Sequence, residues 1–385
     1  MKIIFFAHPS FLQLRSMDNF TGMLSQGMRE RGHDVQVWCP KATLSKLSLG
    51  RSIRKWLGYF DQYVLFPAII QSRIRKCKDD TLFVFTDQAL GPWVPFVRNR
   101  RHVVHCHDFL ALQSALGTIA ENPTRWTGKI YQKYIKDGFS KGRNFITVSR
   151  NTSQHLRDYH PKVMIRNETV YNGLNPNLFQ IDRLDARLYV YVNSNIDVFD
   201  GYIMHVGGNQ WYKNRIGVIE IYNAWRLVGN KELPLILIGE APSAELLDQV
   251  SRSKYKADIH FCVGKNDEFL RNAYSGASVL LFPSLAEGFG WPIAEAMACG
   301  CPVITTNVAP MTEVGGKAAI YVDKRPSRAI EVPYWTFTVA ELVDSLVNSS
   351  AETMADIVNA GKENIKRFDL DQALDTIEQI YLNVE

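Results

Sequence analysis

Short apolar runs alternate with helix-length segments along the first part of the chain. The runs cover residues 3–7, 35–39, 82–86, 103–106 and 145–148. Each run is short enough for a buried strand, and the segments between them are long enough for crossover helices. This alternation predicts a parallel sheet with helices on both faces.

The same pattern restarts after residue 200. Apolar runs follow at residues 202–206, 235–239, 259–263, 279–283, 303–305 and 319–322, and the polar region 175–200 between the two series contains few strand signals. We therefore predict an α/β protein with two Rossmann-like domains joined by that region. In the first domain, residues 16–22 are expected to form a loop before the first helix.

Composition and charge exclude several classes of function. The 385 residues are 46% hydrophobic and 22% charged, with a mild net charge of +5, and no basic block is dense enough to indicate nucleic acid binding. The six cysteines lack metal-ligand spacing, which favours a reducing compartment and a cytoplasmic location. We expect no signal peptide, because the chain opens with a strand, and no membrane span.

Residues 41–76 combine basic and aromatic side chains. The basic residues are Lys41, Lys46, Arg51, Arg54, Lys55, Arg73, Arg75 and Lys76, and they are interleaved with residues such as Trp56, Phe60 and Phe66. A surface of this kind could lie on an anionic membrane, which fits a lipid-linked acceptor. The alternative interpretation is an amphipathic helix that packs on the sheet and exposes a basic face.

The stretch 284–300 carries the clearest chemical pattern. A strand, an acidic glycine-rich turn and a helix are expected in that order, with Pro292 in the first helical turn and Gly300 just past the helix end. Gly288 and Gly290 allow a ligand close to the backbone, and a helix start attracts an anion such as a diphosphate. Glu287 and Glu295 could accept hydrogen bonds from hydroxyl groups on either side of it. A sugar nucleotide has this combination of groups.

The Glu287/Glu295 pair closely resembles the E-x7-E motif of retaining glycosyltransferase family 4, which has the GT-B fold. The resemblance implies that Glu295 binds the nucleotide ribose and that Glu287 faces the donor sugar. The sequence 206–214 resembles the family's phosphate-binding turn, with Lys213 as the diphosphate ligand, although Gly208 stands where many relatives have arginine. His107 resembles the family's histidine beside the donor sugar, and residues 265–270 follow the strand where the nucleotide base is expected to bind.

On this resemblance we expect domains at residues 1–180 plus 366–385 and at residues 195–365, facing an interdomain cleft. The expected catalytic residues are His107 and Glu287. The expected donor-binding residues are Gly207, Gly208, Asn209, Lys213, Val263, Gly288, Phe289, Gly290, Trp291, Pro292 and Glu295.

The resemblance implies transfer of a sugar to a hydroxyl of a polysaccharide or lipid-linked saccharide, without an obligatory metal or other cofactor. UDP-glucose is the first candidate donor, followed by GDP-mannose and other UDP-sugars. Asp369 and Asp371 are interpreted as helix-capping residues rather than metal ligands. Two alternatives are a sugar-nucleotide epimerase and a non-catalytic subunit of a polysaccharide assembly complex. The expected location is cytoplasmic, with peripheral association at the inner face of the plasma membrane as an option.

Overall fold

The computed structural model describes residues 1–12, 14–47, 50–160 and 166–385 and resolves two compact units. Unit 1 comprises Met1–Asn172 and Asp371–Glu385, and unit 2 comprises Gly173–Leu370. The sequence predicts the corresponding boundaries at residues 180 and 366. Within unit 2 the Leu174 amide donates a hydrogen bond to the Phe368 carbonyl oxygen at 2.8 Å, which ties both ends of this unit together.

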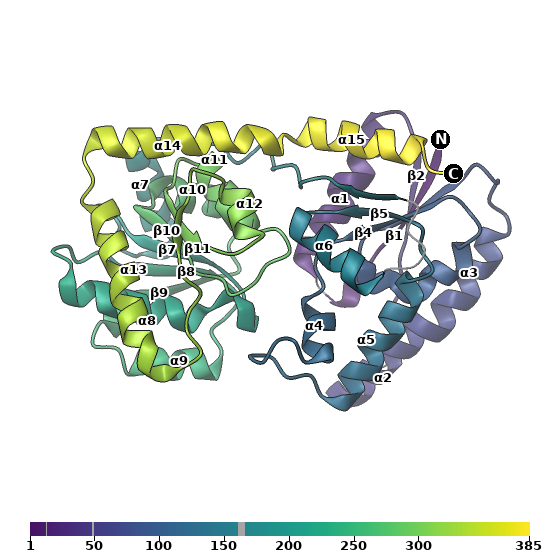
Figure 1. The fold of residues 1–385 in the computed structure, drawn as a ribbon, viewed down its shortest axis with the longest axis horizontal. Coiled ribbons are helices and arrows are strands. Elements are labelled where there is room, and N and C mark those ends of the chain that lie inside the picture. The colour runs from purple at the N-terminus through teal and green to yellow at the C-terminus, as the bar shows by residue number, and fades with distance from the viewer. Residues whose placement is uncertain (13, 48–49, 161–165) are drawn as a thin grey trace. The chain divides into compact units, whose positions relative to one another are not determined.

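Unit 1 contains a parallel sheet that has six strands among the described residues, in the order β2-β1-β3-β4-β5-β6. The strands are β1 (Lys2–Phe6), β2 (Asp34–Trp38), β3 (Leu82–Phe85), β4 (His102–Cys106), β5 (Asn144–Thr147) and β6 (Arg166–Thr169). The helices include α1 (Arg15–Glu30), α2 (Gly50–Phe60), α3 (Phe66–Ile74), α4 (Leu110–Leu116), α5 (Trp126–Phe139) and α6 (Arg150–Tyr159). Figure 1 shows these helices around the sheet.

Unit 1 differs from the prediction in two places. Residues 16–22 lie inside α1 rather than in a loop, because the buried side chains of Phe20, Leu24 and Met28 recur at helical spacing. Strand β6 was not predicted, because its four residues are polar. It is an edge strand of the sheet, so an apolar run is not needed there.

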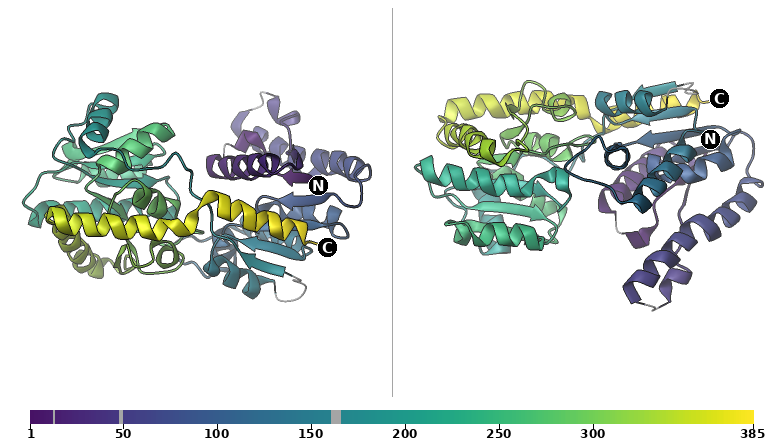
Figure 2. Two further views of the ribbon diagram at one scale, coloured as in Figure 1. Left: turned by 90° about the horizontal axis from the view of Figure 1, so that it is seen from above. Right: turned by 60° about the horizontal axis from the view of Figure 1, so that its bottom comes forward.

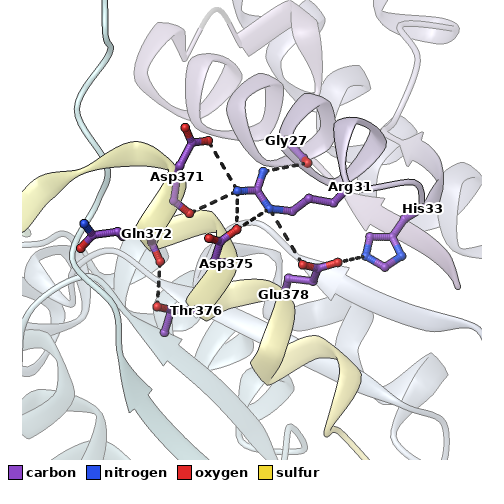
Figure 3. A network of polar contacts seen from close by, with 8 residues as sticks. All are labelled: Gly27, Arg31, His33, Asp371, Gln372, Asp375, Thr376 and Glu378. Atoms are coloured by element: carbon purple, nitrogen blue, oxygen red, sulfur yellow. Dashed lines mark hydrogen bonds and ion pairs between the residues drawn. The ribbon is translucent and has the colours of Figure 1, made fainter.

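The carboxyl-terminal helix α15 (Leu370–Leu382) packs on unit 1, as the resemblance implied. Figure 3 shows Arg31 at the end of α1 among the carboxylates of α15, with its Nη2 2.6 Å from Asp375 Oδ1. His33 Nε2 lies 2.7 Å from Glu378 Oε1. Deeper in the unit, the Tyr381 hydroxyl lies 2.6 Å from His105 Nε2, and both side chains are buried. The helix is therefore held by ion pairs near the surface, by a buried hydrogen bond and by the buried side chains of Leu374, Ile377 and Ile380.

Unit 2 repeats the architecture with a second parallel sheet, for which the described residues give the order β12-β11-β10-β7-β8-β9. Its strands are β7 (Ile203–Gly207), β8 (Leu235–Gly239), β9 (Ile259–Val263), β10 (Val279–Phe282), β11 (Val303–Thr306) and β12 (Ile320–Val322). The helices are α7 (Arg183–Ser194), α8 (Arg215–Val228), α9 (Ala244–Ser251), α10 (Asp267–Gly276), α11 (Trp291–Ala298), α12 (Met311–Gly315), α13 (Val332–Val347) and α14 (Ala351–Ile365). Figure 2 shows the two sheets from further directions.

Each sheet has one place where the strand order reverses. In unit 1 the chain moves outward from β1 to β2 on one side and to β3 on the other, and in unit 2 it does so from β7 to β8 and to β10. The loops that follow two such strands diverge to opposite faces, so the carboxyl ends of these strands are where open α/β sheets bind ligands. Two positions, β1/β3 and β7/β10, thus have the topology of a ligand site.

None of the helices in the described part of the chain is both long enough and apolar enough to cross a membrane.

Candidate active site

The loops after β7 and β10 meet at the reversal point of the unit 2 sheet. A short turn, Trp211–Lys213, follows β7, and the Leu285 amide of the second loop donates to the Tyr212 carbonyl oxygen at 2.7 Å. The Asn214 side chain donates from Nδ2 to the Pro283 carbonyl oxygen at 2.9 Å. These two hydrogen bonds fix one loop against the other.

Lys213 and Glu287 form the centre of this site. Lys213 Nζ donates to Glu287 Oε1 at 2.8 Å and to Oε2 at 3.0 Å. The exposed fraction is 15% for the Lys213 side chain and 8% for that of Glu287. The ammonium group also lies 5.2 Å from the centre of the Phe282 ring. The sequence predicted Lys213 as a diphosphate ligand and Glu287 as a catalytic residue facing the donor sugar, and the structure brings the two side chains into direct contact.

Geometry favours glycine at two positions of these loops. A Cβ on Gly207 would lie 3.0 Å from His205 Nε2 and 3.2 Å from two side-chain carbons of Lys213, so a larger residue would require these side chains to shift by a few tenths of an ångström. Gly290 has a φ of 103° immediately before α11, a conformation that favours glycine. Pro292 lies in the first turn of α11, as predicted, and Gly300 has the left-handed conformation expected after that helix.

Glu295 lies on α11 with a partner that the sequence did not reveal. The Tyr274 hydroxyl of α10 donates to Glu295 Oε2 at 2.8 Å. Burial raises the pKa of Glu295 above its usual range, and the charge of Asp267 adds to this, whereas the Tyr274 hydrogen bond and the Lys213 charge act in the opposite direction. Tyr274 therefore orients a carboxylate that is costly to ionise. Nothing in the sequence marked Tyr274, because its helix reads as an ordinary amphipathic segment.

The polar groups of Asn209 already have hydrogen-bond partners within the protein, and the space beside Gly208 is filled by a side chain. The Asn209 amide donates to Glu240 Oε2 at 3.1 Å, its Nδ2 donates to the Ala241 carbonyl oxygen, and its Oδ1 accepts from Arg215. A Cβ on Gly208 would lie 2.6 Å from Glu240 Oε1. A role for this turn in donor binding stays a prediction.

The other predicted donor residues lie on the strand ends and loops of unit 2. Gly207, Gly239 and Val263 stand in one register row at the carboxyl ends of β7, β8 and β9. Val263 also lines a pocket of about 580 Å3 beside the end of α7. Phe289 is buried and its ring packs against those of Trp291 and Phe368, at centre distances of 5.4 and 5.5 Å. Gly288 lies in the same turn.

His107 belongs to unit 1, where it follows β4. Its Nε2 lies 2.9 Å from the Thr86 carbonyl oxygen, so Nε2 carries the proton and Nδ1 keeps its lone pair. Burial lowers the pKa of His107, although the charge of Asp87 and the Thr86 hydrogen bond oppose this effect. The side chain is therefore a neutral hydrogen-bond acceptor near pH 7.

The described residues contain no group of three or more His, Cys, Asp or Glu side chains that could hold a metal ion. Asp369 and Asp371, at the start of α15, accordingly lie outside any such group.

Comparisons with known proteins agree with this architecture. Residues 17–178 match the family model described as Glycosyltransferase Family 4, and residues 200–331 match Glycosyl transferases group 1. The solved structure of WaaG, a glycosyltransferase involved in lipopolysaccharide biosynthesis, has a TM-score of 0.72 with 15% sequence identity, covering 99% of this chain and 100% of that one. This likeness shows that the fold is GT-B.

Two curated relatives are O-antigen mannosyltransferases. O-antigen chain mannosyltransferase B of Escherichia coli is 34% identical over 134 residues, which cover 34% of this chain and 35% of that protein. O-antigen chain mannosyltransferase RfbU of Salmonella typhimurium is 23% identical over 250 residues, which cover 65% of this chain and 62% of that protein. The matches thus span less than two thirds of either relative. Because the two family models lie in sequence order, one in each half of the chain, the protein belongs to the GT-B glycosyltransferases of family 4.

Proposed function

We propose that the protein transfers a sugar, with retention of anomeric configuration, from a nucleoside diphosphate sugar to a hydroxyl of a saccharide or lipid-linked saccharide in cell-surface polysaccharide synthesis. The observation that carries the proposal is the contact of Lys213 with both carboxylate oxygens of Glu287 at the reversal point of the unit 2 sheet. This pair places a cation and a hydroxyl-binding group where such sheets bind ligands.

In the proposed reaction the Lys213 ammonium moves from Glu287 to the donor diphosphate. There it stabilises the negative charge that develops on the leaving group, with help from the amino-terminal end of α11. Glu287, once released, accepts hydrogen bonds from sugar hydroxyls, and Glu295 accepts them from the ribose. His107 contributes an Nδ1 lone pair that accepts a hydrogen bond from the donor sugar.

The names of the two curated relatives favour mannose as the transferred sugar, and UDP-glucose, which the sequence suggested, is the second candidate donor. The test incubates the protein with GDP-mannose and, separately, with UDP-glucose, in EDTA, and follows nucleotide release and the anomeric proton of the product by NMR. We expect release from one donor, full activity in EDTA and an anomer of unchanged configuration. An altered nucleotide sugar with no nucleotide released would instead indicate an epimerase. No reaction with any donor and no nucleotide binding would indicate a non-catalytic subunit.

We further propose that unit 1 associates peripherally with an anionic membrane through α2 and α5. The two helices lie side by side (Figure 1), with the Tyr59 and Tyr131 rings 5.8 Å apart. Trp56 on α2 is 70% exposed and Trp126 on α5 is 73% exposed. Exposed basic side chains accompany them on both helices, namely Arg54, Lys55, Lys129 and Lys133. Residues 48–49 of the predicted basic stretch, and the Arg51 side chain, lie outside the described residues.

Aromatic side chains flanked by cations suit the headgroup region of an anionic bilayer. The double variant Trp56→Ser/Trp126→Ser should lose most of its co-sedimentation with vesicles of phosphatidylglycerol and phosphatidylcholine. Ile330→Ser in unit 2, which changes a side chain that is 86% exposed, is the matched control. Equal sedimentation of the double variant and the wild type would refute this surface.

A further inference from the structure

The turn after β7 binds an anionic group that the protein itself supplies. The Asn209 amide donates to Glu240 Oε2 at 3.1 Å, and Gln210 Nε2 donates to Glu240 Oε1 at 3.0 Å. Glu240 comes from the neighbouring strand β8, which it directly follows. Both oxygens of its carboxylate thus accept hydrogen bonds from N–H groups of the turn. Such N–H groups also bind phosphate oxygens.

This turn is continuous with the position of Lys213. A Cβ on Gly207, the last residue of β7, would lie 3.2 Å from the Lys213 side chain, and a Cβ on the next residue, Gly208, would lie 2.6 Å from Glu240 Oε1. Two adjacent groups that suit an anion are therefore each in contact with a carboxylate. Glu287 contacts the Lys213 ammonium, and Glu240 contacts the N–H groups of the turn.

Arg215 adds a positive charge beside the turn. Its Nη1 donates to Asn209 Oδ1 at 2.8 Å and to the Glu240 backbone carbonyl oxygen at 3.1 Å. The residue is 5% exposed, and its Nε and Nη2 have no hydrogen-bond partner among the described residues. Burial lowers the pKa of Arg215, whereas the charge of Glu240 acts in the opposite direction. An anion in the place of the Glu240 carboxylate is therefore favourable, whether the protein or a ligand supplies it.

We propose that Glu240 occupies part of the diphosphate site in the absence of donor, and that an oxygen of the donor diphosphate replaces its carboxylate on the turn. This inference rests on the proposed function. The exchange has a low cost, because Glu240, Asn209 and Gln210 are all exposed and contacts of exposed carboxylates contribute little to stability. The Asn209 amide and Gln210 Nε2 then donate to the phosphate oxygen. Arg215 keeps its hydrogen bond to Asn209 Oδ1 and so positions the turn.

The test is calorimetric titration of pyrophosphate into the wild type and into Glu240→Gln. The variant should bind about five- to 20-fold more tightly, because one negative charge no longer competes for the turn. In 1 M NaCl, where charges are screened within about 3 Å, the gain should fall below twofold. The control is Glu245→Gln, which removes the same charge from an exposed residue in the first turn of α9 and should stay within twofold of wild type. Equal or weaker binding by Glu240→Gln, or an equal gain in the control, would overturn the proposal.

Gln210→Ala tests whether the carboxylate and the ligand use the same donor. In the wild-type background it should change pyrophosphate affinity less than twofold, because the ligand and Glu240 both lose a hydrogen bond. In the Glu240→Ala background only the ligand loses one, and the affinity should fall about fivefold. Equal effects in the two backgrounds would overturn the inference.

The same titrations separate this inference from the proposed function. A wild type that binds neither pyrophosphate nor a nucleoside diphosphate would overturn both. A wild type that binds them, with no gain in Glu240→Gln, would overturn this inference only.

Discussion

The two sheets reverse their strand order in the same way, yet they carry different chemistry at the reversal points. In unit 2 a lysine forms an ion pair with a carboxylate beside glycine-rich turns, and this arrangement is suited to an anionic ligand. In unit 1 a histidine after β1, His8, contacts the carboxylate of Asp87 after β3, and burial lowers the pKa of a second histidine, His107, which is hydrogen-bonded to a backbone carbonyl. The topology fixes where a ligand binds, and the few side chains on the loops decide which ligand that is.

The largest effect is expected from removing the cation of unit 2. Lys213→Met should weaken nucleoside diphosphate binding about 10- to 100-fold, because a charge-assisted hydrogen bond to phosphate is lost. It should also destabilise the protein by about 3–5 kcal/mol, since Glu287 is left buried without its partner. Calorimetric titration and urea unfolding measure the two effects.

The double variant Lys213→Met/Glu287→Gln separates these two effects. It should recover much of the stability and none of the nucleotide affinity. Lys231→Met, at an exposed lysine of the same unit, is the control for both measurements. Recovery of affinity in the double variant would mean that Lys213 acts only through Glu287.

A smaller effect is expected at Glu295, where a substitution should weaken nucleotide binding without lowering the stability of the fold. Glu295→Gln should weaken nucleotide binding about tenfold, because the amide is a poorer acceptor for ribose hydroxyls. The same variant should be at least as stable as wild type at pH 7. The folded state raises the pKa of Glu295, so the ionised form is disfavoured on folding.

That stability difference should disappear as the pH falls toward the ordinary glutamate pKa of about 4.3, where the side chain is protonated in both the folded and the unfolded state. Thermal melts of the two proteins from pH 7 to pH 4 follow it. A wild type that is more stable than Glu295→Gln at pH 7, and less so at pH 4, would show that the ionised carboxylate stabilises the fold.

The smallest effect on catalysis is expected from Tyr381→Phe. This variant tests whether His105, the hydrogen-bond partner of Tyr381, only stabilises the fold or also takes part in the reaction. Tyr381→Phe leaves His105 Nε2 buried without the hydroxyl and should cost about 1–3 kcal/mol of unfolding free energy. Donor hydrolysis should not change. Tyr334→Phe, at a residue that is 82% exposed, is the control and should stay within about 0.5 kcal/mol of wild type. Loss of hydrolysis at full stability would place His105 in the chemistry.

Much of the fold could be predicted from the sequence because the central strands are continuous apolar runs, such as β1 and β8, and are buried on both faces. Strand β6 could not, since an edge strand of Arg, Asn, Glu and Thr has no such signal. At the site, Lys213 and Glu287 were found through motifs on adjacent loops. Tyr274, His8 and Asp87 were not, because their partners lie 21 and 79 positions away in sequence and only the packing of helices and strands brings them together.

The most direct measurement is calorimetric titration of UDP, GDP and ADP into the wild-type protein and into Glu295→Ala, without added metal. The account predicts that the wild type binds one of these nucleotides selectively and that Glu295→Ala binds it at least tenfold more weakly. Absence of binding to all three, or equal affinity in the two proteins, would contradict the assignment of the β7/β10 loops as the donor site.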